Sequence, residues 1–174
     1  MSLVREGRAW LFGDDINTDL IFPNRAMRLP LEEQHREVFS ANRPGWVDQV
    51  APGDIIVGGN NFGMGSGRPV GRLLASCGIA GVLANSVNGL CLRNCVSFGL
   101  PALTAHGVTE LFEDGERVWV DYATGRIKNL DRNTSMEATG LPRLFQELVE
   151  GGGAIPMLIK EGWIEAEPRL AAAT

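Results

Sequence analysis

The sequence lacks the features that mark membrane proteins, secreted proteins and nucleic-acid-binding proteins. Its 174 residues contain no apolar run that approaches the roughly 20 residues needed to span a bilayer. The first residues hold no apolar signal core. The formal net charge is −5 and no basic cluster occurs, which argues against a nucleic-acid surface. We therefore expect a cytoplasmic protein with neither membrane nor nucleic-acid partners.

Cysteine and histidine are also scarce, which limits the metal chemistry open to this chain. There are three cysteines, an odd number, and only two histidines, His35 and His106, which are remote from each other in sequence. Cys91 and Cys95 would share one face of a helix, but a structural zinc site needs four ligands. The sequence favours buried free thiols over a metal site. We expect no cofactor and no metal to be bound by this chain alone.

The most distinctive stretch is a glycine-rich segment, residues 58–72. It follows a short apolar run at residues 54–57, which predicts a buried strand. It leads into an apolar segment that predicts a helix, and Pro69 suits the first helical position, where its missing N–H is not needed. Strand, loop and helix start together direct backbone N–H groups toward whatever lies in the loop. Ser66 adds a hydroxyl and Arg68 a positive charge.

Three interpretations of this loop remain open. It is a tight turn, a nucleotide phosphate loop or a carboxylate-binding site. The Walker pattern requires a lysine that is absent here, and the glycines at positions 63, 65 and 67 do not have the dinucleotide spacing. Arg68 as a bidentate carboxylate clamp beside Ser66 is the interpretation that the chemistry favours.

The rest of the chain predicts an α/β domain. Between residues 54 and 104, strand and helix patterns alternate, and the strands read as continuous apolar runs typical of a parallel sheet covered on both faces. A period-two pattern then predicts a β-hairpin. Strands are predicted at residues 8–12, 54–57, 78–84, 101–104, 116–122 and 127–130, and helices at residues 31–39, 87–98 and 141–150. The apolar run at residues 154–159 is predicted to cover the core.

Two polar segments near the N-terminus allow more than one interpretation. The acidic stretch at residues 13–19 is an Asx-rich turn or a calcium loop, although the EF-hand spacing is missing. Residues 24–52 form a long connection between predicted elements. Connections of this length in a compact domain are usually functional or disordered. Arg25 and Arg28 near its start are solvated charges or reach a substrate carboxylate.

Three ordered segments resemble the small subunit of 3-isopropylmalate dehydratase, the swivel domain of the aconitase superfamily. Residues 13–23 are similar to the family's Asn-Ile-Asp-Thr-Asp-x-Ile-x-Pro. Residues 59–68 match the family's Gly-x-Asn-Phe-Gly-x-Gly-Ser-x-Arg. Residues 93–101 are similar to Arg-Asn-Cys-x-Asn-x-Gly-Leu-Pro. The resemblance covers about residues 8–165 and implies that residues 1–174 form one swivelling β/β/α three-layer domain with a partly parallel central sheet.

The resemblance also implies a partner and a reaction. A large subunit would carry a [4Fe–4S] cluster on its own cysteines and form a heterodimer or heterotetramer with this chain. One iron would act as a Lewis acid toward a small hydroxy-acid substrate. Water would be removed from and returned to isopropylmalate, as in leucine biosynthesis. The family's catalytic base is the first serine of Gly-Ser-Ser-Arg-Glu, which is Ser66 here. The implied substrate-binding residues are Arg68, Gly65, Gly67, Arg25, Arg28 and Met27.

The chain departs from the family pattern around this serine. The family's second serine, glutamate and histidine are replaced by Gly67, Pro69 and Val70. The specificity loop, often Tyr-Leu-x-x-x in the family, is Ala-Met-Arg-Leu-Pro at residues 26–30. Two alternatives therefore stay open: a related dehydratase that acts on another alkylmalate or a citrate-like hydroxy acid, and a non-catalytic anion-binding swivel domain.

Overall fold

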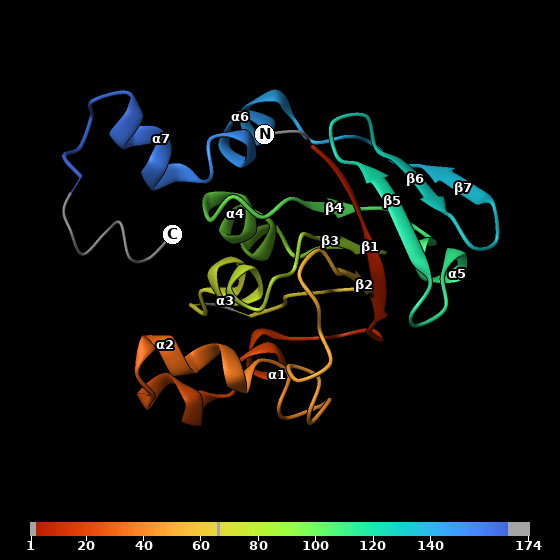
Figure 1. Ribbon diagram of the computed structural model, residues 1–174, viewed down its shortest axis with the longest axis horizontal. Coiled ribbons are helices and arrows are strands. Elements are labelled where there is room, and N and C mark those ends of the chain that lie inside the picture. Colours follow the sequence, from red (N-terminus) through yellow and green to blue (C-terminus); the bar gives the residue numbers. More distant parts are fainter. Residues whose placement is uncertain (1–2, 66, 167–174) are drawn as a thin grey trace.

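The computed structural model describes residues 3–65 and 67–166, and within them seven strands form one sheet in the order β4-β3-β2-β1-β5-β6-β7 (Figure 1). The strands are β1 Val4–Leu11, β2 Ile55–Gly58, β3 Gly81–Ala84, β4 Ala102–Thr104, β5 Arg117–Asp121, β6 Arg126–Asn129 and β7 Thr134–Glu137. The α-helices are α1 Thr18–Ile21, α2 Leu31–Gln34, α3 Val70–Ser76, α4 Gly89–Ser97, α5 Val108–Leu111, α6 Arg143–Glu150 and α7 Ala154–Lys160, and two 3₁₀ segments are η1 Asn24–Arg28 and η2 His35–Glu37.

Strand β1 joins a parallel half of the sheet to an antiparallel half. Its first five residues pair antiparallel with β5, with Val4 opposite Asp121. Its last three residues pair parallel with β2, where Ala9 lies opposite Ile55. Strands β2, β3 and β4 continue in parallel, and β5, β6 and β7 continue antiparallel. In Figure 1, the two halves therefore extend to opposite sides of β1.

A buried carboxylate fixes the parallel contact between β1 and β2. Asp54, directly before β2, accepts hydrogen bonds from the Arg8 guanidinium at 2.8 Å and the Trp10 indole N–H at 2.7 Å. The Ala51 N–H donates to the same oxygen at 2.9 Å. Burial opposes ionisation of Asp54, but these donors hold its pKa below the usual range. The carboxylate thus links both strands to the connection that precedes β2.

Two buried apolar clusters lie on the two faces of the parallel strands. Alternate residues of β2 divide between them, because successive side chains of a strand point to opposite faces. Ile56 packs in the cluster that includes Leu73 and Leu74 of α3. Ile55 and Val57 pack in the cluster that includes the inner residues of β5 and β6. The arrangement confirms the predicted α/β class with helices, parallel strands and antiparallel strands as successive layers.

Most predicted elements are present, but several segments differ from the prediction, among them the helix predicted at residues 31–39, which is the short α2 followed by η2. Strand β7 was not predicted, because its residues are mostly exposed and polar and leave no apolar alternation. The prediction that residues 154–159 cover the core was wrong in part, since they form α7, which has no buried residue. None of the helices in the described part of the chain is long and apolar enough to cross a bilayer.

The phenol of Tyr122 lies inside the second cluster without a hydrogen-bond partner among the described residues. Its ring packs against the backbone of β3: a Cβ placed on Gly81 would lie 2.1 Å from the Tyr122 hydroxyl oxygen. Burial raises the pKa of this phenol far above its ordinary value. Tyr122 is therefore a neutral space-filling group whose hydroxyl makes no hydrogen bond to the described residues.

Replacing this tyrosine tests the uncompensated hydroxyl. Tyr122→Phe is expected to raise the free energy of unfolding by about 1 kcal/mol, because the buried, unpaired oxygen is removed while the ring remains. Thermal and urea unfolding of the purified chain measure the change. Gly81→Ala is the control and should destabilise the protein clearly, because its methyl group meets the phenol. A marked loss of stability in Tyr122→Phe would show that the hydroxyl has a partner.

Candidate functional site

The carboxyl ends of the parallel strands meet at one edge of the sheet, and the loops that leave them lie together. In parallel α/β sheets, this edge is where ligands usually bind. The loop after β1 contains the acidic turn, the loop after β2 is the glycine-rich segment, and the loop after β3 leads into α4. The first two family-like segments lie in these loops, and the third contributes Asn94 and Phe98 to the pocket beside them.

The loop after β1 holds one side of the glycine-rich loop. The Gly63 N–H donates to the Ile16 carbonyl at 2.7 Å, and the Thr18 N–H donates to the Met64 carbonyl at 2.8 Å. Asp14 accepts a hydrogen bond from the Asn60 backbone N–H at 2.6 Å, and this bond lowers the pKa of Asp14. Asp14 thus binds the glycine-rich loop, and the local bonds expected of an Asx-rich turn come from Asn17, whose Oδ1 accepts from the Asp19 and Leu20 N–H groups.

The loop after β3 holds the other side of the glycine-rich loop. The Phe62 N–H donates to the Ser86 carbonyl at 2.9 Å, and the Asn88 N–H donates to the Phe62 carbonyl at 2.8 Å. The Phe62 ring between these bonds is fully buried. The glycine-rich loop is therefore fixed on both flanks before it reaches α3.

Glycine is required at two loop positions because neighbouring groups approach the backbone closely. Gly63 has φ +75°, and a Cβ there would lie 2.2 Å from the Cys91 sulfur. Gly65 has φ +114°, and a Cβ there would lie 2.6 Å from Thr18 Oγ1. Gly67 has φ +83° but faces open space. Gly65 and Gly67 flank Ser66, the predicted catalytic base, which lies outside the described residues.

The side chain of Arg68 is largely buried and reaches back to the first loops. Its side chain is 15% exposed, whereas the Asp19 carboxylate that forms an ion pair with its Nη2 is 69% exposed. Nε donates to the Phe22 carbonyl at 3.3 Å, and Nη1 contacts the Met27 sulfur at 2.7 Å. The structure therefore brings Arg68 and Met27 together, as two of the predicted site residues, and adds Asp19.

The two other predicted arginines differ from Arg68. Arg25 donates to the Glu37 carboxylate and to the Ser40 hydroxyl, each at 3.1 Å, so it links η1 to the end of η2 and to the residues that follow. Arg28 is exposed, and within the described residues its guanidinium has no hydrogen bond or ion pair. Of the two, Arg28 is the one free to meet a ligand.

A pocket of about 280 Å³ opens beside the glycine-rich loop. Its polar lining includes Arg68, Asn94 and the backbone of Gly65 and Gly67. Its apolar lining comes from Val70 and from α4 and the residue that follows it: Leu90, Cys91 and Phe98. The sequence did not point to this helical wall, because an apolar helix face is ordinarily read as core packing.

Helix α3 begins one residue later than predicted, so Pro69 is its N-cap residue and has no capping side chain. Asn94 of α4 takes that role, because its Oδ1 accepts a hydrogen bond from the Gly71 N–H at 2.8 Å. The two helices touch at this point: a Cβ on Gly71 would lie 2.7 Å from Cys95 Cα. Asn94 therefore fixes the start of α3 directly after Arg68.

The cysteines are free thiols, as predicted. Cys91 and Cys95 are buried on one helix face with their sulfurs 4.0 Å apart, and Cys77 lies elsewhere. Burial raises the pKa of Cys77 to about 12, so this thiol stays protonated at neutral pH. Among residues 3–65 and 67–166, no three His, Cys, Asp or Glu side chains are grouped to hold a metal ion. The described residues do not fit an iron–sulfur cluster.

The fold and the site define a class: a layered α/β domain with a glycine-rich loop and a partly buried arginine at the carboxyl edge of its parallel strands. The chain is 38% identical over 161 residues to the 3-isopropylmalate dehydratase small subunit 1 of Methanopyrus kandleri, an alignment that covers 91% of this chain and 95% of that one. It is 37% identical over 165 residues to the isopropylmalate/citramalate isomerase small subunit of Methanocaldococcus jannaschii, covering 92% and 97%.

A solved structure agrees with these relatives. The crystal structure of 3-isopropylmalate dehydratase (leuD) from Methanocaldococcus jannaschii superimposes with a TM-score of 0.85 at 30% identity, over 93% of this chain and 97% of that one. No protein-family model matches the sequence. The chain belongs to the 3-isopropylmalate dehydratase small subunit family, whose members are subunits of hydro-lyases, and this confirms the resemblance seen in the sequence. The name small subunit implies a large-subunit partner.

The two glycines that flank Ser66 should respond differently to a methyl group. Gly67→Ala is expected to lower the free energy of unfolding by about 1 kcal/mol, since only a left-handed backbone is disfavoured. Gly65→Ala should lower it by roughly 2–4 kcal/mol, because its methyl group also meets Thr18. Urea unfolding of both variants measures this. Thr18→Ala in the Gly65→Ala background should recover part of the loss, and equal losses for the two glycines would contradict the contact.

Proposed function

We propose that this chain is the small subunit of a hydro-lyase that interconverts 2-isopropylmalate and 3-isopropylmalate by loss and return of water. The observation that carries the proposal is the meeting of the three family-like segments at one pocket that contains Arg68. The relatives named as isopropylmalate enzymes support the choice of substrate. We also propose that residues 1–174 act as one swivel domain in the cytoplasm, with its core at about residues 8–165.

The chemistry required is the removal of a proton beside a carboxylate and of hydroxide from the neighbouring carbon, which leaves a carbon–carbon double bond. We assign the proton transfer to Ser66. Ionising a serine hydroxyl is costly in water, so the loop has to stabilise the resulting anion. The Arg68 guanidinium and the loop N–H groups are held in fixed positions by the neighbouring loops, and such preorganised donors are effective when the site closes and excludes water.

Arg68 is the group that we propose binds a substrate carboxylate. An arginine carries five N–H donors, and the contacts with Asp19, Phe22 and Met27 leave some of them for a ligand. Met27 of η1 contacts Arg68, and Arg28 is the next residue of η1; we propose that both contact the part of the substrate that differs between alkylmalates. The apolar α4 wall at Leu90 and Phe98 suits an alkyl group. Gly65 and Gly67 allow the backbone to approach the substrate.

The cluster belongs to the proposed partner. The described residues of this chain offer no ligand set for it, so we place the [4Fe–4S] cluster on a large subunit and assign to this chain only the loop, Ser66 and the carboxylate contacts. The active site is then shared between two chains, in a heterodimer or a heterotetramer.

A second candidate substrate has specific support. One relative is named an isopropylmalate/citramalate isomerase small subunit. In addition, residues 26–30 differ from the loop found in many isopropylmalate enzymes. A smaller alkylmalate such as citramalate is therefore the alternative substrate, with the same proton transfer and the same carboxylate clamp.

The function is tested by isolating the large subunit that co-purifies with this chain and assaying the reconstituted complex. We expect turnover of isopropylmalate by the complex and by neither subunit alone, measured by the ultraviolet absorbance of the alkene. Citramalate and citrate are assayed in parallel to rank the substrates by kcat/KM. A stable complex, loaded with its cluster, that dehydrates none of these acids would contradict the proposal and favour an anion-binding domain.

Two variants of the loop should fail in different ways. Ser66→Ala is expected to lower kcat by about three orders of magnitude or more with little change in KM, because the base is lost while the carboxylate contacts remain. Arg68→Lys should mainly raise KM, since the charge stays but the planar fork is lost. Steady-state kinetics of the complex measure both effects.

Matched controls separate these effects from damage to the fold. Ser135→Ala on exposed β7 and Arg143→Lys on exposed α6 make the same chemical changes away from the site. Both should keep normal kinetics, and all four variants should have similar melting temperatures. A Ser66→Ala complex with near-normal kcat would refute the assignment of Ser66 as the base.

A further inference from the structure

The pocket of about 280 Å³ beside the glycine-rich loop contains polar groups to which the proposed reaction assigns no role. Its lining includes the side chains of Thr18 and Asn94 in addition to Arg68. Among the described residues that line it, Arg68 carries the only formal charge, and no Asp or Glu takes part. The pocket therefore suits a ligand that is an anion and accepts hydrogen bonds.

The side-chain amide of Asn94 has a fixed orientation. Its Oδ1 accepts a hydrogen bond from the Gly71 N–H at 2.8 Å, and a backbone N–H can only donate. The oxygen therefore faces Gly71, and the Nδ2 group points away from it. Within residues 3–65 and 67–166, this Nδ2 group has no acceptor. An amide NH₂ carries two donors, so Asn94 has both available for a ligand in the pocket that it lines.

Helical spacing places this amide between two apolar side chains. Leu90, Asn94 and Phe98 are four residues apart, so they follow one side of α4 and its C-terminal end. All three line the pocket. A polar group between two apolar ones suits a ligand in which a carboxylate adjoins an alkyl group.

The hydroxyl of Thr18 is a second unpaired group in the same pocket. Thr18 is only 6% exposed, and its hydroxyl has no hydrogen-bond partner in the described part of the chain. The backbone holds it in place, because the Thr18 carbonyl accepts a hydrogen bond from the Phe22 N–H at 2.9 Å. A Cβ on Gly65 would lie 2.6 Å from Oγ1, so the hydroxyl lies directly against the glycine-rich loop. A buried, unpaired hydroxyl is unfavourable, and a ligand that accepts its hydrogen bond would remove this cost.

Arg68 alone does not provide enough donors for a substrate with two carboxylates. A guanidinium has five N–H donors. The contacts with the Phe22 carbonyl, the Met27 sulfur and the Asp19 carboxylate use three of them. The remaining N–H groups can hold one carboxylate in a bidentate contact. A second carboxylate needs other donors, and the unpaired amide and hydroxyl provide them.

We propose that Asn94 and Thr18 bind the second carboxylate of the substrate, through Nδ2 and Oγ1 as donors, while Arg68 binds the first. This inference rests on the proposed function, since the ligand is an alkyl-substituted diacid. The alkyl group would lie against Leu90 and Phe98, on either side of the amide. The pocket would then distinguish a diacid from a monoacid that has the same alkyl group.

Three unreactive acids test for the second carboxylate contact on the full-length chain. 2-Isopropylsuccinate has both carboxylates of isopropylmalate and lacks the hydroxyl group that the reaction removes. 4-Methylpentanoate and 2,3-dimethylbutanoate each keep the isopropyl group and one of the two carboxylates. Titrations followed by nuclear magnetic resonance should show that the diacid binds at least about tenfold more tightly than either monoacid, because a hydrogen bond to a charged group is worth about a factor of ten or more.

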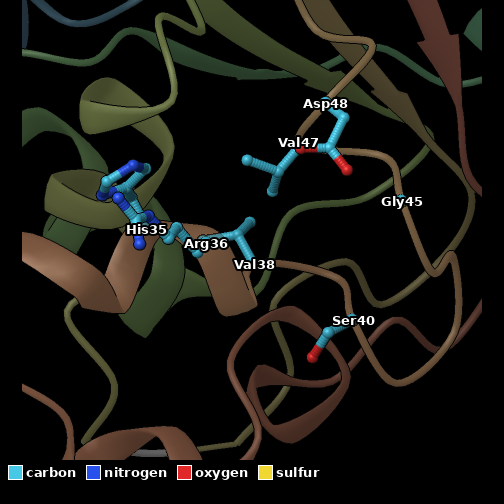
Figure 2. Close-up of a pocket in the computed structure, with 7 residues that line it drawn as sticks. All are labelled: His35, Arg36, Val38, Ser40, Gly45, Val47 and Asp48. Atoms are coloured by element: carbon cyan, nitrogen blue, oxygen red, sulfur yellow. The ribbon is translucent and has the colours of Figure 1, made fainter.

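The Asn94 side chain reports the contact directly. Its ¹H–¹⁵N amide signals, identified by their absence from the spectrum of Asn94→Asp, should move on titration with 2-isopropylsuccinate. The Leu90 methyl signals should move with them. The methyl signals of Val47 are the control and should stay in place. Val47 lines a separate pocket of about 380 Å³ in the connection between α1 and β2, where Figure 2 shows it beside Asp48.

Asn94→Asp separates ligand binding from the structural role of this residue. An aspartate keeps an oxygen for the Gly71 N–H, so the melting temperature should hardly change. The two N–H donors are lost and a repelling charge is added, so binding of 2-isopropylsuccinate should weaken about tenfold or more. A purely structural Asn94 would leave the affinity unchanged in this variant.

Thr18→Val removes the hydroxyl and keeps the branched shape without adding charge. It should weaken binding of the diacid about tenfold and leave unchanged the binding of a monoacid that Arg68 alone holds. Thr18→Ser keeps a hydroxyl and should bind the diacid as the unmodified chain does. Asn133→Asp and Thr134→Val make the same changes at exposed positions next to and in β7, and both should leave binding unchanged.

Equal affinities for the diacid and both monoacids would overturn the inference. Absence of diacid binding at tens of millimolar would overturn it, and so would diacid binding that survives both Asn94→Asp and Thr18→Val. These measurements involve neither turnover nor the large subunit. A chain that binds the diacid as expected, in a complex that does not dehydrate isopropylmalate, would contradict the proposed function alone. A complex that turns over isopropylmalate with unchanged KM in both variants would contradict this inference alone.

Discussion

The double pairing of β1 is the constraint on which the rest of this structure depends. Residues 4–8 pair with an antiparallel strand, and residues 9–11 pair with a parallel one. The strand passes very close to the residues that precede β2: a Cβ on Gly7 would lie 1.9 Å from the Gly53 carbonyl oxygen. One eight-residue strand therefore determines how the helical layer, the parallel strands and the antiparallel layer are placed relative to one another.

The position of the pocket beside Arg68 follows from that arrangement. Parallel pairing of β1, β2 and β3 brings three successive loops to one edge, where backbone hydrogen bonds join them into a single surface. The glycine-rich loop then has no freedom to collapse, since Gly63 and Gly65 are in contact with Cys91 and Thr18. The conformation of the glycine-rich loop is thus determined by its contacts with the neighbouring loops at this edge of the sheet, in addition to its glycines.

The sequence predicted the strands of the parallel half because each is a short apolar run that is buried on both faces. It also predicted the family, because three motifs keep their order and spacing. It did not predict β7, whose residues are polar and exposed, nor the N-terminal half of β1, where Arg5, Glu6 and Gly7 interrupt any apolar pattern. The N-terminal half of β1 is defined by pairing with the distant β5, and β7 is defined by pairing with the preceding β6. Neither strand carries an apolar alternation of its own that would mark it in the sequence.

The candidate site was predictable in its parts but not in its connections. The motifs singled out Arg68 and Met27, yet their contact joins residues 41 positions apart, and the ion pair of Arg68 with Asp19 joins residues 49 positions apart. Arg25, which the sequence left as either a solvated charge or a substrate contact, binds Glu37 within the chain. The pattern of charges in a sequence does not show whether an arginine is available to bind a ligand or already forms an ion pair within the chain.

The ion pair between Arg68 and Asp19 has a consequence for ligand selection. Because the Asp19 carboxylate already offsets the charge of the guanidinium, a carboxylate bound to the N–H groups that remain would gain less than from an unpaired arginine. Under the proposed role of Arg68, a monoanion would therefore gain little from this contact alone. A diacid would gain more, since its second carboxylate would be bound elsewhere without an internal competitor. The internal pair would then favour ligands by the number of their charges, independently of their carbon skeleton.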